Sequence, residues 1–284
     1  MEKQLLVGAH LNTSAGFATT FKNADKISAQ VIQIFLKSNR TWLGPSLSDL
    51  RVKEFKTAKT QSAVKLVVAH ASYLINLAAA KDEILQKSIL ALIDEVLRCE
   101  KLGIPYLVLH PGCFTTSSRE TGLTQVSQAL NKVLSKTNGS CLLLLENMAG
   151  QGSTLGANFE ELATIRNSTH ETEKIGFCLD TCHAFAAGYN FSTEKDLTKM
   201  LETFDNACGI HNLKIVHLND SKEEFASRKD RHENIGTGKI GLTVLQKVLQ
   251  HPKLKQLAFI LETPVDDSPT GYLVHKEEIS LLKI

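Results

Sequence analysis

The 284-residue sequence lacks the features that mark membrane-spanning, secreted and tail-driven nucleic-acid-binding proteins. No apolar run approaches the ~18 to 20 residues that a membrane-spanning helix needs. Residues 1–8 are too few and too charged to form a secretory signal. A net charge of +2 gives no support to a histone-like protein. Any affinity for nucleic acid therefore has to come from a local patch of basic side chains and a specific binding site.

Cysteine is scarce as well, and its spacing excludes the common metal ribbons. The six cysteines form no CxxC pair, and the spacing of Cys178 and Cys182 matches a zinc ribbon poorly. Cys141 and Cys178 lie in apolar, strand-like runs, and Cys99 lies in a helix-like segment. We therefore expect free, buried thiols in a reducing cytoplasm, and a cytoplasmic protein without membrane contact.

Short apolar runs alternate with segments of helical spacing along the whole chain. The expected strands are 5–9, 31–35, 64–69, 106–109, 141–145, 175–179, 213–216 and 257–261, and the expected helices are 18–27, 48–61, 80–102, 123–134, 159–165, 197–208, 242–249 and 278–284. Strict alternation predicts parallel strands joined by crossover helices. Eight repeats of this size predict an α/β fold, a single-domain (β/α)8 TIM barrel over residues 1–284. A doubly wound sheet is the alternative, but residues 13–16 do not supply its usual GxGxxG turn.

Titratable side chains end the expected strands three to eight. His183 follows three residues after Asp180, which ends strand six, and Asp230 and His232 lie in the loop after strand seven. Active sites of such barrels lie at the carboxyl ends of the strands, so these side chains should share one mouth. The nine candidates are His70, His110, Glu146, Asp180, His183, His217, Asp230, His232 and Glu262.

Each candidate alone has an ordinary structural explanation, as a hydrogen-bonded histidine or a helix-capping carboxylate. Together, four crowded carboxylates repel one another and need cations. Mixed imidazole and carboxylate sets suit zinc, manganese or iron, and nine ligands are too many for one zinc ion. Clustered metals clamp the attacking and leaving oxygens of a phosphoryl displacement, which points to phosphoester hydrolysis.

Two other functions compete with hydrolysis. A sugar isomerase or epimerase on the same barrel would need only one or two metals, and Glu146, Asp180, His217 and Glu262 would suffice. That function leaves the other five candidates unexplained. A barrel that binds DNA lesions without cutting them is the second alternative. It does not account for the retention of so many crowded carboxylates.

Several stretches resemble the motifs of the endonuclease IV family. Residues 70–77 (HASYLINL) are similar to its first motif, and residues 177–183 (FCLDTCH) are similar to its second. Residues 217–222 (HLNDSK) with 230–232 (DRH) are similar to its third, and shorter matches lie between them. The resemblance covers nearly the whole chain. It implies a TIM barrel and a zinc-dependent abasic-site endonuclease of base excision DNA repair.

The resemblance also implies a role for each of the nine candidates. One zinc ion would be held by His70, His110 and Glu146, and Glu146 would bridge to a second. The second would also be held by Asp180, His217 and Glu262, and the third by His183, Asp230 and His232. Manganese or iron are possible substitutes for zinc. Glu262 and Glu146 are the expected catalytic residues, with Glu262 as the base that orients or deprotonates the nucleophile.

The implied substrate is double-stranded DNA that contains abasic sites or blocked 3′ ends. The phosphodiester 5′ to the abasic site would be hydrolysed, leaving a 3′-hydroxyl and a 5′-deoxyribose phosphate, and we expect the enzyme to be a monomer. Arg40, Tyr73 and Leu74 match the residues that the family inserts into the base stack.

A phosphate-facing patch is expected from five cations, Lys37, Lys222, Arg228, Arg231 and Lys239. Ala15, Ser38 and Ala226 depart from the residues usual in the family. His10 ends the first strand without matching a family ligand. We expect it to hydrogen-bond to a ligand.

Overall fold

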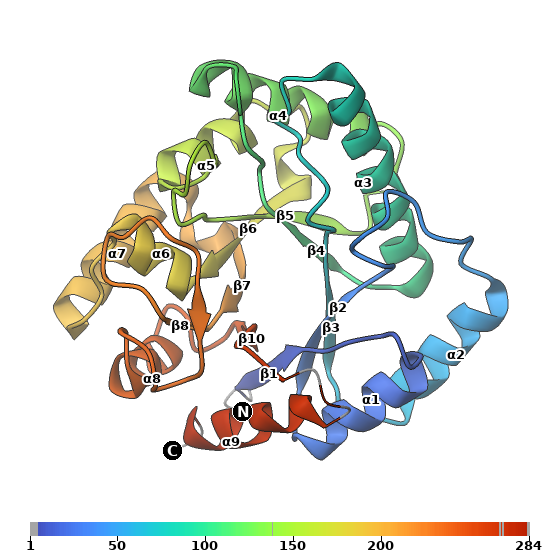
Figure 1. Cartoon of the computed structure of the whole chain (residues 1–284), viewed down its shortest axis with the longest axis vertical. Helices are drawn as coiled ribbons and strands as arrows, with labels where there is room; N and C mark the ends of the chain where they lie inside the picture. The colour runs from blue at the N-terminus through green and yellow to red at the C-terminus, as the bar shows by residue number, and fades with distance from the viewer. Residues whose placement is uncertain (1–4, 138, 267, 269, 283–284) are drawn as a thin grey trace.

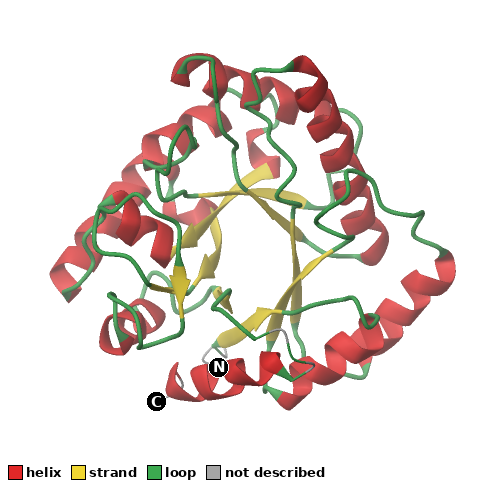
Figure 2. Ribbon diagram, viewed as in Figure 1, coloured by secondary structure: helices red, strands yellow, loops and turns green. Residues whose placement is uncertain are grey.

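The computed structural model describes residues 5–137, 139–266, 268 and 270–282. Its parallel strands form a closed barrel in the order β1-β10-β7-β6-β5-β4-β3-β2, which confirms the predicted TIM barrel (Figures 1 and 2). The strands are β1 (Leu6–His10), β2 (Val31–Phe35), β3 (Leu66–His70), β4 (Tyr106–Leu109), β5 (Leu142–Glu146), β6 (Ile175–Asp180), β7 (Leu213–His217) and β10 (Ala258–Leu261).

A ring of helices surrounds the barrel, and Figure 2 shows it as an outer layer. The outer helices are α1 (Phe17–Lys26), α2 (Asp49–Thr60), α3 (Asp82–Leu102), α4 (Arg119–Leu134), α5 (Phe159–Asn167), α7 (Glu194–Cys208), α8 (Leu242–Gln250) and α9 (Val274–Leu282). Helix α3 ends where predicted, because Gly103 adopts the left-handed conformation at its C-cap. Helix α9 lies between α8 and α1 in the ring (Figure 1).

Side chains inside the barrel form a small apolar cluster, separate from the larger core beneath the helices. Its members are Val31, Val68, Val108, Leu144, Cys178, Ile215, Ala258 and Ile260. Because side chains alternate across a strand, the residue two positions further along faces the barrel axis too. His70, Glu146 and His217 occupy such positions, two residues beyond Val68, Leu144 and Ile215. The inward direction of the strand-end side chains therefore follows from the packing of the barrel interior.

The alternation of strands and helices is less strict than predicted. A short helix, α6 (Thr181–Ala187), follows β6 directly, and a two-stranded antiparallel sheet, β8 (Asp220–Ser221) with β9 (His232–Glu233), follows β7. Helices α4 and α9 also begin four residues earlier than expected. The extra elements lie at the rim of the barrel, where α6 carries His183, β9 carries His232, and Asp230 lies two residues before β9.

Two other predictions concern the chain as a whole. All six cysteines are free, as expected. Within the described ranges, no helix combines the length and apolar character that crossing a membrane requires. Residues 1–4, in the segment considered as a secretory signal, and 283–284, at the end of the last expected helix, lie outside the described residues.

The loop after β8 is held in a conformation that favours glycine at Ala226. This residue has a φ of 58°, in the left-handed region. Its N–H donates to the carbonyl oxygen of Phe185 at 3.1 Å, and the N–H of Arg228 donates to that of Ala186 at 2.9 Å. The docking of the loop on α6 thus fixes a backbone angle that is unfavourable for a residue with a side chain.

We predict that Ala226→Gly stabilises the protein. An L-residue in the left-handed region costs about 1–2 kcal/mol, and the extra flexibility of glycine in the unfolded chain offsets part of the gain. The free energy of unfolding should rise by roughly 0.5–1 kcal/mol, measured by urea-induced unfolding. Ala15→Gly is the matched control, because Ala15 does not share the positive φ. An equal rise in both variants would contradict the explanation.

Candidate metal centre

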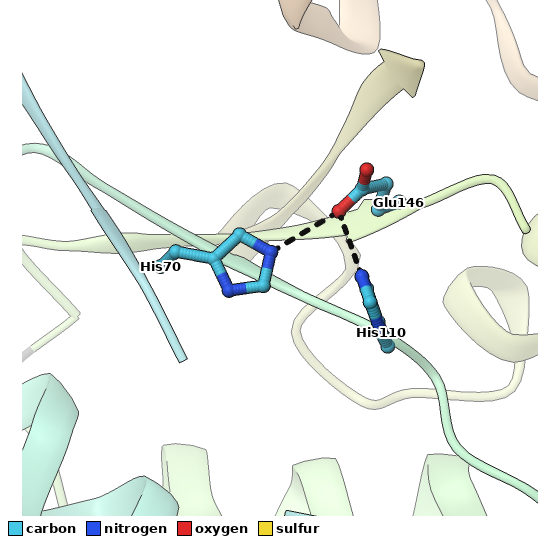
Figure 3. A group of neighbouring side chains, drawn as sticks. All are labelled: His70, His110 and Glu146. Atoms are coloured by element: carbon cyan, nitrogen blue, oxygen red, sulfur yellow. Dashed lines mark hydrogen bonds and ion pairs between the residues drawn. The ribbon is translucent and has the colours of Figure 1, made fainter. Parts of the chain in front are cut away.

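Glu146 lies at the bottom of the barrel mouth and is fully buried. Its Oε2 is 3.3 Å from Nε2 of His70 and 3.3 Å from Nε2 of His110, and Figure 3 shows both rings directed at this oxygen. The three side chains come from β5, the end of β3 and the residue after β4. Their ligand atoms lie within 4.8 Å of one another, close enough to share one ion.

A second group uses the other oxygen of Glu146. Nδ1 of His217 lies 2.9 Å from Glu146 Oε1, 3.1 Å from Glu262 Oε2 and 4.0 Å from Asp180 Oδ2. Glu146, Asp180 and His217 are fully buried, whereas Glu262 opens towards the mouth. Glu146 therefore belongs to two adjoining groups.

The third group stands at the rim and is the most open. Nε2 of His183 lies 3.2 Å from Asp230 Oδ2, and Nε2 of His232 lies 3.5 Å from Asp230 Oδ1. His232 Nε2 is also 3.6 Å from Asp180 Oδ2, which connects this group to the second. Cys182 adjoins Asp180 and His232, but burial raises the pKa of its thiol to about 12. A protonated thiol is a poor ligand, so Cys182 is the weakest candidate at the site.

The second nitrogen of three imidazoles is bound to a backbone carbonyl. Nδ1 of His70 donates to Ala71 O at 2.8 Å, and Nδ1 of His183 donates to Asn147 O at 2.8 Å. Nδ1 of His232 donates to the carbonyl oxygen of Glu262 at 3.1 Å. Such bonds fix the tautomer, and they leave Nε2 of each ring with a lone pair aimed at the carboxylates.

Asp180 both caps a helix and faces the other candidate ligands, so the structural and the metal-binding explanations apply to it together. Its Oδ1 accepts from the N–H of His183 at 2.7 Å and caps helix α6. Its Oδ2 accepts from Asn219 Nδ2 at 2.6 Å and faces the third group. The cap also sets the position of His183, three residues later.

Three neutral residues orient the charged ones, and sequence reasoning did not select them for the site. Gln33 donates from Nε2 to Glu262 Oε1 at 2.5 Å and accepts at Oε1 from His217 Nε2 at 2.9 Å. Asn219 donates from Nδ2 to the carboxylate of Asp180, and the side-chain Oδ1 of Asn147 accepts from the backbone N–H of Asp180. The position of Gln33, two residues beyond the inward-facing Val31, is the signal that would have found it.

His10 supports Glu262 in the way expected. Its Nδ1 lies 3.4 Å from Glu262 Oε1 and 3.1 Å from Gln33 Nε2. Gln33 thus connects the ends of three strands, β1, β7 and β10.

The site's electrostatics reflect crowded, opposite charges. Burial acts to raise the pKa of Glu146, but the imidazoles of His217 and His110 hold it well below its usual value. Burial acts to lower the pKa of His183, but Asp180 and Asp230 raise it well above its usual value. Without metal, the neighbouring carboxylates therefore favour the protonated form of His183, and a metal ion that binds this imidazole has to displace its proton.

Two buried atoms show that the side chains fit a cation. Nε2 of His183 and Nε2 of His232 are buried and have no hydrogen-bond partner among the described residues. Both face the carboxylate of Asp230, at 3.2 and 3.5 Å, and a nitrogen lone pair that faces a carboxylate needs a positive charge between them, which a proton or a metal ion supplies. Together with the clusters of buried imidazoles and carboxylates, these atoms are consistent with a metal cofactor.

A cavity of about 410 Å³ opens over the groups and gives access to them. Tyr73 lines it and is 66% exposed, so it is not a core residue. Leu74 is half-buried beside it, and Arg40 is exposed on the loop after β2. His275 was not foreseen; it also lines the cavity, and its Nδ1 is 2.9 Å from Glu278 Oε2.

Lys37 does not belong to a phosphate-facing patch, contrary to the prediction. Its side chain is 2% exposed, and its Nζ lies 2.6 Å from Glu95 Oε1. The buried carboxylate of Glu95 turns the lysine inward. Lys222, Arg228, Arg231 and Lys239 remain as candidates for the patch.

Comparisons with known proteins agree with the geometry. Residues 21–283 match the family described as xylose isomerase-like TIM barrel. The chain is 41% identical over 258 residues to the probable endonuclease 4 of Halothermothrix orenii, covering 91% of this chain and 93% of that one. It is 40% identical over 280 residues to the probable endonuclease 4 of Chlorobium phaeobacteroides, covering 98% and 96%.

Comparison with solved structures also finds an endonuclease IV. The crystal structure of endonuclease IV from Thermus thermophilus superposes with a TM-score of 0.85 at 35% identity, covering 98% of this chain and 99% of that one. A D-tagatose 3-epimerase-like protein superposes with a TM-score of 0.74 at 17% identity, covering 98% and 97%. The second likeness shows a shared fold alone.

We predict that Gln33→Ala weakens metal retention, because His217 and Glu262 lose the amide that orients both. Loss of such a supporting residue typically lowers metal affinity by about 10–100-fold. Competition with a chelator, followed by counting the metal that remains on the protein, measures the effect. Ser127→Ala is the control, since Ser127 is a buried hydrogen-bonded residue outside the mouth. Wild-type resistance to the chelator in Gln33→Ala would refute the assignment.

Proposed function

We propose a specific reaction for this chain, which belongs to the endonuclease IV family, the abasic-site endonucleases of base excision repair. In that reaction, water hydrolyses the phosphodiester bond 5′ to an abasic nucleotide in double-stranded DNA. The products are a 3′-hydroxyl and a 5′-deoxyribose phosphate. The same site would remove blocking groups from damaged 3′ ends, because a group joined through a phosphate to the 3′ oxygen is released by hydrolysis of the same kind of phosphorus–oxygen bond.

The observation that carries the proposal is the convergence of nine imidazoles and carboxylates in three adjoining groups at one cavity. We assign His70, His110 and Glu146 to one ion, and Glu146, Asp180, His217 and Glu262 to a second. His183, Asp230 and His232 would hold the third. Three zinc ions fit this donor set, and manganese or iron would fit it as well.

The bound ions would supply positive charge that binds the phosphodiester, activates water and stabilises the leaving oxygen. The chain's own residues would do the rest. Glu146 would fix the spacing of the first two groups through its two oxygens. Glu262, held by Gln33 and lining the cavity, would orient the attacking water and accept its proton. The bond between phosphorus and the 3′ oxygen of the preceding nucleotide would then break.

Recognition would depend on deformation of the DNA more than on base sequence. An abasic nucleotide has no stacked base, so its extrusion from the duplex costs less than that of an intact one. Tyr73 is exposed at the edge of the cavity, and Arg40 and Leu74 lie on the adjacent loops. These three side chains would fill the gap in the base stack, and the protein would act as a monomer.

A sugar isomerase or epimerase on the same barrel is the second candidate. The second group alone would suffice for that chemistry. It would not explain the first and third groups, or the buried, unpartnered nitrogens of His183 and His232. The epimerase-like solved structure shares the fold at 17% identity and carries no argument for its substrate.

The decisive experiment uses a duplex with one abasic analogue, with and without exhaustive chelation, and counts the metal on the purified protein. We expect a single nick on the 5′ side, lost on chelation, with close to three ions per chain. A protein with one ion per chain and no nick would favour the isomerase.

We predict that Glu262→Gln lowers the cleavage rate by at least about 100-fold, because general base catalysis contributes on this scale. Glutamine keeps the shape of the side chain but not its basicity. Affinity for the abasic duplex should be largely retained, measured by fluorescence anisotropy, and the metal content should be counted in parallel. A variant that cuts at close to the wild-type rate would exclude the role of Glu262 as a base.

A further inference from the structure

A line of charged residues on helix α3 lies under the loop that carries Arg40. Glu95, Arg98 and Lys101 are spaced three residues apart, so they share one side of the helix. The loop comprises residues 36–48, between β2 and α2. One side of this loop faces a cavity of about 820 Å³, so packing alone does not fix its position.

Three cations bind the backbone of this loop at successive points. Lys37 Nζ donates to Thr41 O at 3.0 Å and pairs with Glu95. Arg98 Nη2 donates to Pro45 O at 2.8 Å, and its Nε is held by Asp94 Oδ2 at 2.8 Å. Lys101 Nζ donates to Leu47 O at 2.7 Å.

Gly44 allows this close approach. A Cβ at this position would lie 2.9 Å from the Cβ of Lys37 and 3.2 Å from Nη2 of Arg98. The loop can therefore lie directly on the two cations only because residue 44 has no side chain.

Glu95 also holds the second loop, the one that carries Tyr73 and Leu74. Both of its carboxylate oxygens accept from the N–H of Ser72 at 3.3 Å. Oγ of Ser72 in turn donates to Asn39 O at 2.9 Å, directly before Arg40. The carboxylate of Glu95 thus connects the two loops through Lys37 and Ser72, and the hydroxyl of Ser72 connects them a second time through Asn39.

The pair of Lys37 and Glu95 is buried, with side chains 2% and 1% exposed. Burying two charges requires their desolvation, and an apolar pair of similar size is often as stable or more so. Stability is therefore a weak explanation for this pair. What the ion pair adds over an apolar pair is geometry, because it fixes the direction and distance of both partners.

We propose that Glu95, acting through Lys37 and Ser72, is the positioning residue that sets the spacing between Arg40 and the pair Tyr73–Leu74. It presents the three side chains to DNA as a pre-formed wedge, and Arg98 and Lys101 hold the rest of the first loop. The inference rests on the proposed function. A preorganised wedge lowers the ordering cost of binding, so it contributes to recognition of the abasic duplex and not to the hydrolytic step.

The test is single-turnover cleavage of an abasic-analogue duplex over a range of enzyme concentrations. Glu95→Gln should raise the enzyme concentration for half-maximal rate by at least about tenfold, because ordering of the loops then has to occur on binding. The limiting rate and the metal content should stay within about threefold of the wild type. Glu83→Gln is the matched control, since Glu83 forms an exposed ion pair of 2.6 Å with Lys87 on the same helix.

A double variant, Lys37→Met with Glu95→Leu, separates positioning from stability. It leaves no unpaired buried charge, so it should fold even if Glu95→Gln does not. Positioning predicts that the double variant still binds the abasic duplex weakly. It also predicts faster hydrogen exchange in the amides of residues 38–47 and 72–75, and unchanged exchange in the barrel strands.

The outcomes distinguish this inference from the proposed function. A wild-type enzyme that cuts abasic DNA, with both variants binding and exchanging as the wild type does, would overturn the inference and leave the function standing. A wild-type protein that does not cut would overturn the function, and hydrogen exchange would still test whether Glu95 holds the two loops.

Discussion

The parallel strands of a closed barrel all end at the same rim, and this constraint governs the whole site. Six candidates stand at or directly after the ends of their strands, two positions beyond a residue of the inner apolar cluster. Charge repulsion opposes the crowding of carboxylates such as Glu146 and Asp180. The packing of Leu144 and Cys178, two positions earlier in the same strands, nevertheless holds Glu146 and Asp180 close together. The barrel interior therefore contributes the free energy that holds a site which is unfavourable by itself, and cations complete it.

Neutral residues orient the crowded charged side chains of the site. Gln33 binds Glu262 with one end of its amide and His217 with the other, and neither contact adds charge. Backbone carbonyls such as Asn147 O fix the tautomer of the imidazoles. Each ring is therefore oriented before a metal arrives, so little rearrangement remains for binding. The same arrangement explains why Nε2 of His183 is buried without a partner.

Periodicity was enough to predict the barrel and the clustering of the six side chains at the ends of its strands, whereas His183, Asp230 and His232 were selected by residue type and by their place in the segments that follow the strands. The apolar runs marked the strands, and the side chains at their ends had to share one rim. Helix α6 was missed because it is seven residues long and too short for a periodic signal. Gln33 was missed because reasoning from charge ignores an amide. Lys37 was misplaced because nothing near it in the sequence reveals Glu95, 58 positions further along and buried beside it.

The molecule contains two sets of buried carboxylates, those of the barrel mouth and Glu95 on helix α3. They differ in where the cation that balances their charge comes from. The carboxylates of the mouth are suited to cations from solution, whereas Glu95 has a cation from the chain itself, Lys37. The contacts that hold the two loops use Lys37, Glu95 and Ser72 and none of the nine side chains. These contacts set the spacing of the two loops from within the chain, and His70 adds a bond to the start of the second loop through Ala71 O. The proposed wedge and the metal-binding side chains thus share one barrel mouth but depend on different balancing cations, so the spacing of the loops and the proposed hydrolytic step can be altered separately.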